Sequence, residues 1–168
     1  METITIDKTN TYLGFRLANE IFAISVANVI EVVRDTGLTS VPKTTDYVAG
    51  IINFRGEILS VVSAWKKLNV PGEEQAKKRV IVVIELLEKG DKTSKVGIIA
   101  DKVIGVLNIP GSQIQPVMEF GNYYNPEFLK GAFKYKNDIV TILDIGEIFS
   151  QEEVEVINNV NKTKNQKN

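Results

Sequence analysis

The chain contains no cysteine and no histidine among its 168 residues. Without cysteine there is no disulfide framework and no thiolate chemistry. Without histidine the chain lacks the commonest general base, the base of serine-hydrolase triads and the usual zinc ligand. The other side chains form no phosphate-binding loop, serine elbow or metal-ligand spacing. We therefore expect no enzymatic activity, no metal and no cofactor.

An excess of charge of one sign is also missing. Twenty Lys and Arg residues face twenty-one Asp and Glu residues, which gives a formal net charge of −1. This balance does not favour nucleic acid or an acidic membrane as a partner. No apolar stretch approaches bilayer length, and Met1–Thr11 lacks the basic start and apolar run of a signal peptide. We therefore expect a cytoplasmic location.

Short segments rich in β-branched residues occupy most of the chain and predict strands joined by tight turns. Val80–Leu87 is nearly all apolar, which is typical of a strand buried on both faces. The other predicted strands are Thr11–Leu17, Ile21–Val26, Val29–Val33, Ile51–Phe54, Ile58–Val62, Lys95–Ala100, Ala132–Tyr135 and Ile139–Leu143.

Helix signals are few. Ala64–Leu68 fits a single helical turn, and Ser150 with Glu153 forms a capping box for a short helix over Gln151–Asn159. The residues from Asn158 to Asn168 are rich in Asn and Lys and offer little to bury, so we expect a disordered tail there.

The sequence contains an internal repeat. Tyr47–Gly50 and Phe128–Gly131 are both aromatic-x-x-Gly, and Gly56–Val62 aligns with Asn137–Leu143 without a gap. A second pair of similar segments is Ala23–Val33 and Gly97–Leu107. Chance similarity between alternating β sequences is the competing explanation, but it does not readily account for an ungapped match. The repeat predicts two small β-barrels packed together, because closure removes exposed strand edges.

The two copies differ at one turn. Asn53-Phe54-Arg55-Gly56 stands in the first copy where Lys134-Tyr135-Lys136-Asn137 stands in the second. An arginine at the tip of a rigid hairpin offers a forked donor that suits a carboxylate or backbone carbonyls on a partner. An ordinary solvated turn residue is the alternative, and the pattern alone leaves both open.

The segment Gly50-Ile-Ile-Asn-Phe-Arg-Gly56 resembles the G-x-x-N-L-R-G signature of CheW-type chemotaxis coupling proteins. Val29–Val32, Gly97–Val103 and Leu129–Asp144 resemble further family motifs in the same order, so that the resemblance spans Tyr12 to Phe149. Phe54 replaces the usual leucine, and Ser63-Ala64 stands where Asp-Leu is common.

The resemblance implies an all-β fold of two five-stranded SH3-like barrels with a short C-terminal helix, forming one domain over residues 1–168. We expect subdomains at about 12–70 and 78–150. It also implies a non-enzymatic scaffold, associated with membrane receptor arrays, that couples transmembrane chemoreceptors to the regulatory domain of a histidine kinase. By position in the motifs, the implied receptor-binding residues are Val29, Asn53, Arg55, Gly56, Val80, Gly97 and Val103, and the implied kinase-binding residues are Val26, Glu31 and Val32.

Other interpretations stay open at this point. The three receptor-side valines also fit a core, Gly97 fits a barrel bend, and Trp65 fits packing between units. The same coupling module could serve a non-motility pathway. A single-strand nucleic-acid binder is a further alternative, because some aromatic and basic residues interleave. These residues are Tyr123, Tyr124, Lys130, Phe133, Lys134, Tyr135 and Lys136.

Overall fold

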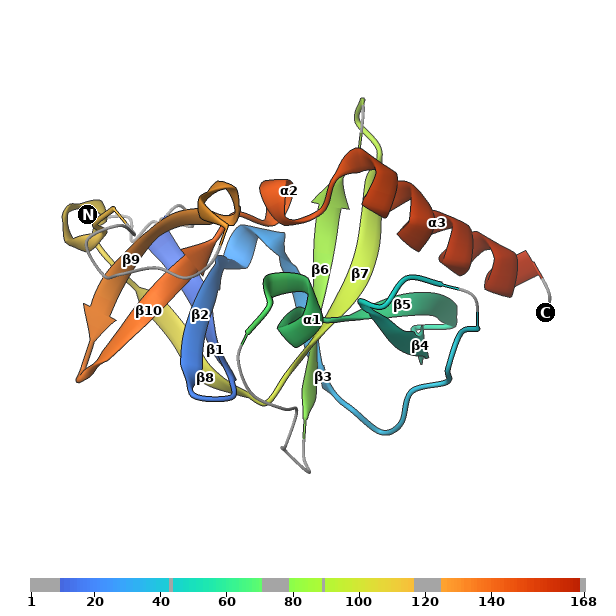
Figure 1. Cartoon of the computed structure of the whole chain (residues 1–168), viewed down its shortest axis with the longest axis horizontal. Coiled ribbons are helices and arrows are strands. Elements are labelled where there is room, and N and C mark those ends of the chain that lie inside the picture. The colour runs from blue at the N-terminus through green and yellow to red at the C-terminus, as the bar shows by residue number, and fades with distance from the viewer. Residues whose placement is uncertain (1–9, 43, 71–78, 89, 117–124, 167–168) are drawn as a thin grey trace, which may run out of the picture.

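The computed structural model describes residues 10–42, 44–70, 79–88, 90–116 and 125–166, and these ranges are mostly β-strand. The strands form two sheets of five, one in each lobe of the molecule (Figure 1). In the first sheet the order is β8-β1-β2-β10-β9, and in the second it is β3-β6-β7-β5-β4. The first sheet contains β1 (Thr11–Leu17), β2 (Glu20–Ser25), β8 (Lys102–Asn108), β9 (Leu129–Tyr135) and β10 (Asp138–Leu143). The second contains β3 (Val29–Arg34), β4 (Val48–Phe54), β5 (Glu57–Ser63), β6 (Val80–Leu87) and β7 (Thr93–Ala100).

Each sheet is closed by a short backbone bridge. Thr39, after β3, exchanges two hydrogen bonds of 3.0 and 2.9 Å with Ile51 of β4. Gln115, after β8, exchanges two of 2.8 and 2.9 Å with Ala132 of β9. Each bridge joins the segment after one outer strand to the other outer strand, so the predicted pair of small five-stranded barrels is confirmed.

The two barrels are built by the same rule, as the repeat predicts. In each, an antiparallel hairpin (β1–β2 or β6–β7) continues through a parallel pair (β2–β10 or β7–β5) into a second hairpin. Equivalent backbone bonds also recur: Ser63 N donates to Tyr47 O, and Asp144 N donates to Phe128 O, each at 2.7 Å. The aromatic-x-x-Gly motif therefore occupies the same structural position in both copies of the repeat.

The predicted contiguous subdomains, 12–70 and 78–150, are wrong. β1 and β2 pair with β8 and β10 from the second half of the chain, while β3 pairs with β6. Each barrel thus takes two strands from one copy of the repeat and three from the other. The sequence specifies the repeated unit, but both copies offer equivalent edges. Which copy completes a barrel is therefore a matter of tertiary structure, as in domain swapping.

The β1–β2 hairpin is buried on both faces. Tyr12 and Ala23 point into the core of the first barrel, whereas Phe15 and Phe22 point into a larger core shared with the second sheet. Trp65 lies in that shared core with 5% of its surface exposed, which agrees with the predicted packing role. Alternation along the strands therefore separates one barrel's interior from the seam between the barrels.

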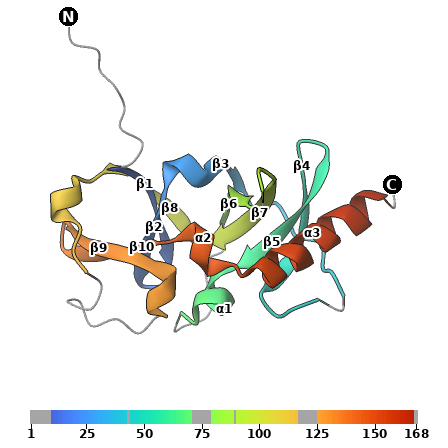
Figure 2. The same cartoon turned by 90° about the horizontal axis from the view of Figure 1, so that it is seen from above.

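Short helices lie at or near the seam between the two barrels. α1 (Ala64–Leu68) follows β5, and α2 (Ile145–Ile148) lies between the two lobes (Figures 1 and 2). Single 3-10 turns stand at Val26–Asn28, Gly111–Gln113 and Pro126–Phe128.

The C-terminal helix α3 is longer than predicted, from Gln151 to Gln166. Its capping box is confirmed: Ser150 N donates to Glu153 Oε1 at 3.0 Å, and Glu153 N donates to Ser150 Oγ at 3.1 Å. The expected disordered tail is wrong up to Gln166, because Asn161 bonds to β5 and extends the docked face of the helix. Residues 167 and 168 lie outside the described residues.

Candidate functional site

The turn between β4 and β5 is held by its own residues. Phe54 pairs with Glu57, so Arg55 and Gly56 form a two-residue loop with φ of +52° and +85°. The Asn53 side chain accepts a hydrogen bond from the Gly56 N–H at 2.9 Å. Glycine adopts positive φ at little cost, and the hydrogen bond to the asparagine side chain stabilises the turn. Asn53 and Gly56 therefore give Arg55 a defined position.

The Arg55 side chain is oriented from two sides and still accessible. Its Nη2 lies 3.0 Å from Glu31 Oε2, and its Cζ lies 5.0 Å from the centroid of the buried Phe54 ring. The side chains of Arg55 and Glu31 remain 64% and 41% exposed. The structure thus joins two residues for which the family resemblance implies different partners.

A groove runs beside this pair. It has a volume of about 510 Å³ and lies between β3, the segment after it and β4, within the second barrel. Its lining mixes charged, polar and aliphatic groups, which suits a protein segment better than a buried metabolite. The lining residues are Glu31, Val33, Arg34, Thr36, Gly37, Thr39, Ile51, Ile52, Asn53, Phe54 and Arg55. The sequence did not reveal the part played by the segment after β3, because only the fold brings it against β4.

The predicted valines do not all share this surface. Val26, Val29, Val80 and Val103 are half-buried and pack against the shared core. Val32, on the edge strand β3, is 37% exposed. The valines lie on β3, β6, β8 and the 3-10 turn before β3, so they are spread along the seam and not gathered at the Arg55 turn.

Gly97 is buried in β7. A Cβ at this position would lie 2.7 Å from Ile81 Cγ2 and 3.3 Å from Val61 Cγ2. The glycine is therefore needed for close packing between β6 and β5, and its assignment to partner binding stays a prediction.

A second polar cluster, which the sequence analysis did not find, lies around Lys67 of α1. Lys67 Nζ is 2.7 Å from Glu153 Oε2. It also lies 5.5 Å from the ring centroid of Tyr47, 5.3 Å from that of Phe128 and 5.9 Å from that of Phe149. An ammonium group near three aromatic faces and a carboxylate is held by cation–π and ionic attraction. This cluster, the Lys67 clasp, ties α1 and α3 to the aromatic positions of both repeats.

The pKa of Glu153 reflects these contacts. Burial alone would raise it, but the hydrogen bond from Lys67, the capping bonds with Ser150 and the Lys67 charge together lower it. The pKa of Tyr47 is raised, mainly by burial and also by the Glu153 charge. Glu153 is therefore held in its charged form.

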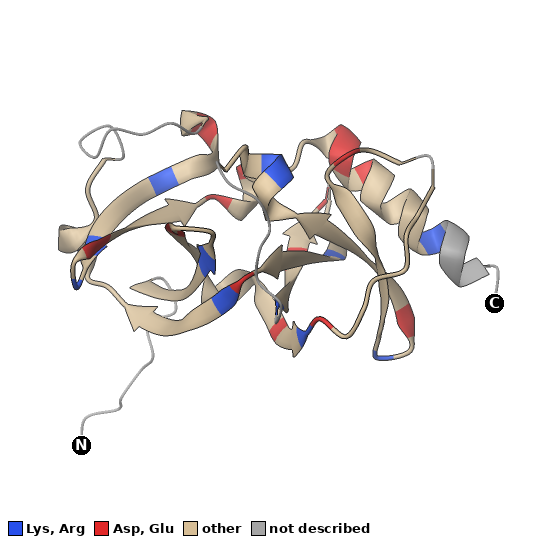
Figure 3. Ribbon diagram, turned by 60° about the horizontal axis from the view of Figure 1, so that its bottom comes forward, with Lys and Arg blue, Asp and Glu red and all other residues tan. Residues whose placement is uncertain are grey.

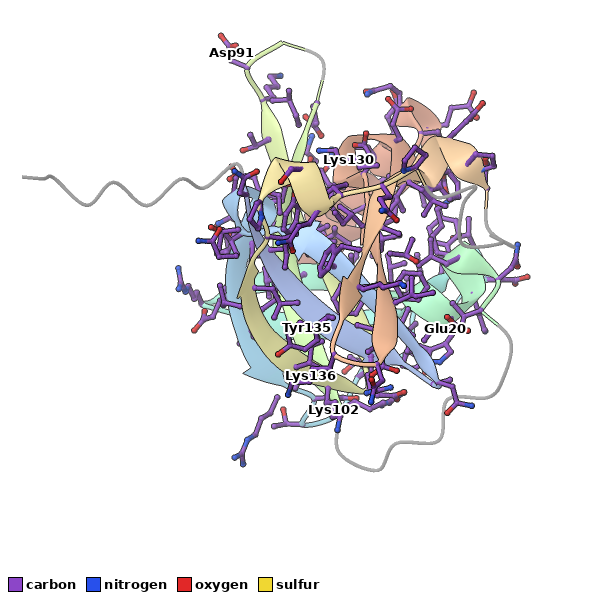
Figure 4. All side chains as sticks on the ribbon, turned by 90° about the vertical axis from the view of Figure 1, so that its left-hand side faces the viewer. Glu20, Asp91, Lys102, Lys130, Tyr135 and Lys136 are labelled. Carbon is purple, nitrogen blue, oxygen red and sulfur yellow. The ribbon has the colours of Figure 1, made fainter. Side chains whose placement is uncertain are left out.

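Among the described residues named in the nucleic-acid interpretation, no aromatic ring is fully exposed for base stacking. Phe133 is fully buried and Tyr135 is half-buried, while Lys130, Lys134 and Lys136 are exposed as on any half-buried strand. Tyr123 and Tyr124 lie outside the described residues. Acidic and basic positions are interspersed over both lobes in Figure 3. Figure 4 shows that Tyr135, Lys136 and Lys102 lie toward one end of the first sheet. Asp138 pairs with Arg16 at 3.6 Å in that sheet. The described surface thus offers no continuous basic track.

Comparison with known families matches residues 11–153 to the CheW-like domain. The chain belongs to the CheW-like family. It is 28% identical over 152 residues to the chemotaxis protein CheW of Klebsiella aerogenes, covering 90% of this chain and 89% of that protein. It is 32% identical over 139 residues to the chemotaxis protein CheW of Thermotoga maritima, covering 83% and 87%. The crystal structure of the scaffolding protein TtCheW from Thermoanaerobacter tengcongensis superposes with a TM-score of 0.72 at 27% identity, covering 84% of this chain and 88% of that one.

Among the described residues, no three acidic side chains are grouped so that they could hold a metal ion. No helix in the described ranges is long and apolar enough to cross a membrane.

Proposed function

We propose that this protein is a non-enzymatic adaptor of chemotaxis signalling that couples transmembrane chemoreceptors to a histidine kinase. The proposal rests on the Arg55–Glu31 pair, held on a rigid hairpin beside an open groove in a CheW-like chain. Such a surface suits binding, because it offers a fixed charged fork and aliphatic walls. We place the protein in the cytoplasm, at receptor arrays.

In this proposal the receptor tip contacts Arg55, which Asn53 and Gly56 position, together with the seam residues Val29, Val80, Gly97 and Val103. The kinase regulatory domain contacts Val26, Glu31 and Val32. Because Arg55 and Glu31 lie 3.0 Å apart, the two partner faces meet at this ion pair. A change in one face can therefore reach the other through a single contact, which is the coupling that an adaptor needs.

The test is a binding assay on Arg55→Ala with a receptor cytoplasmic fragment and with the kinase regulatory domain. Arginine side chains at interface centres contribute about 2 kcal/mol or more, so receptor affinity should fall about 30-fold. Kinase affinity should change much less, because Val26, Glu31 and Val32 are all still present. The melting temperature should stay nearly unchanged, because exposed ion pairs add little to folding.

Lys136→Ala is the matched control. Lys136 occupies the equivalent turn of the other barrel, has φ of +56°, and its Nζ lies 5.4 Å from the Tyr135 ring centroid. This variant should bind both partners normally. Unchanged receptor capture by Arg55→Ala would contradict the assignment.

A further inference from the structure

One face of α3 is docked on the second barrel. Val154 and Ile157 are 4% and 0% exposed, and Asn161 follows Ile157 by four residues on the same face. The helix contacts β5 and β7, along which it runs in Figure 2. Asn161 is thus the polar continuation of an apolar docking stripe.

Asn161 stands where two parallel strands separate. β5 and β7 pair only from Val61 opposite Gly97 to Ser63 opposite Ile99. One step earlier, a parallel ladder would have the Ser60 N–H donate to the Lys95 carbonyl.

The Asn161 carboxamide takes the place of that bond. Its Oδ1 accepts from Ser60 N at 2.8 Å and from Ser60 Oγ at 2.7 Å, and its Nδ2 donates to Lys95 O at 3.4 Å. The side chain therefore acts as an inserted peptide group that joins the diverging strands and satisfies their backbone groups.

This junction lies at the base of the Arg55 hairpin. Between Ser60 and the turn, β5 pairs with β4 and no longer with β7. Asn158 and Asn161 also border a cavity of about 200 Å³ together with Phe54, whose ring lies beneath the Arg55 guanidinium. The helix thus joins β5 to β7 at the point where their ladder ends, at the base of the hairpin.

We propose that α3 positions the Arg55 hairpin, with Asn161 as the positioning residue. The effect on partner binding rests on the proposed function, but the effect on the hairpin itself does not. Without the carboxamide, the free backbone groups at Ser60 and Lys95 turn to water, and the hairpin changes its mean angle.

The experiment compares Asn161→Ala with Asn159→Ala, a substitution at an exposed position of the same helix. Amide hydrogen exchange of the chain alone should be at least about tenfold faster at Ser60 and across the hairpin in Asn161→Ala, and unchanged in the first sheet. Asn161→Asp retains the acceptor for Ser60 and should recover part of the protection.

Receptor-fragment affinity should fall several-fold in Asn161→Ala although Arg55 is intact. Unchanged exchange at Ser60 would overturn the proposal, as would a uniform increase over both barrels, which indicates only lost stability. If the exchange result holds but Arg55→Ala leaves receptor capture intact, the positioning role stands and the proposed function fails.

Discussion

At the scale of single residues, Arg55 and Gly97 differ in what constrains them: exposure on the surface in one case and close packing in the other. Arg55 is exposed and oriented, so we expect its substitution to affect binding and hardly to affect folding. Gly97 is enclosed, and its missing Cβ leaves room for Ile81 and Val61. Both residues belong to family motifs, but only their surroundings in the fold separate a contact residue from a packing residue.

Gly97→Ala should destabilise the fold by about 1–3 kcal/mol, because the new methyl group would overlap Ile81 in a packed core. Urea denaturation measures this change. Gly111→Ala is the control, since a Cβ there meets no atom within 4 Å. If Gly97→Ala keeps full stability but loses receptor binding, the packing explanation is wrong and the predicted contact role is right.

At the candidate site, the turn could be predicted from the sequence but the ion pair could not. The Asn-Phe-Arg-Gly turn is local chemistry, in which a side-chain cap and a positive-φ glycine act within four residues, and it could be recognised directly. The partnership of Arg55 with Glu31 spans 24 residues and two strands that are not adjacent in their sheet. No local pattern contains it.

At the scale of elements, α3 is attached to the rest of the protein at two points along its length. Glu153 in its first turn joins the Lys67 clasp, and Asn161 in its third bonds to β5. The capping box was predictable from Ser150 and Glu153, because it is a four-residue signal. The extension to Gln166 was not, since the residues after Asn158 lack an apolar stripe, and Asn161 bonds to strands that are distant in the sequence.

The Lys67 clasp predicts a pH-dependent stability. The folded-state pKa of Glu153 lies below its ordinary value of 4.5. The stabilising contribution is therefore complete at neutral pH, and it is lost as the pH falls below 4.5 and through the folded-state pKa. Glu153→Gln keeps the capping geometry but removes the charge, and should cost about 1–3 kcal/mol at pH 7.

The measurement is the difference in unfolding free energy between wild type and Glu153→Gln as a function of pH. The difference should shrink towards zero in acid, and Glu152→Gln, at an exposed neighbouring position, should show little difference at any pH. A constant difference from pH 7 to pH 3 would show that the charge of Glu153 is not responsible.

At the scale of the whole molecule, the exchange of strands between the repeats makes the two barrels interdependent. Neither half of the chain contains a complete barrel, and the shared core includes residues of both sheets. The repeat made two barrels predictable, but not their strand exchange, because equivalent edges have equivalent sequences. We therefore expect the protein to unfold as one cooperative unit, which would suit the proposed adaptor role.

Cutting the chain between Val70 and Arg79 should leave two halves that do not fold alone. Each half lacks the strands that close its barrel, so its circular dichroism should show no cooperative unfolding. Mixed in equal amounts, the halves should recover the β signal and a single transition. Independent folding of residues 79–168 would contradict the exchanged topology.

The most direct test of the adaptor role is a three-component capture. A receptor cytoplasmic fragment is immobilised, and the kinase is added with and without this protein. We predict that the kinase is retained only when the protein is present, and that Arg55→Ala removes most of this retention while Lys136→Ala does not. Equal kinase retention with and without the protein, or no retention in either case, would contradict the account.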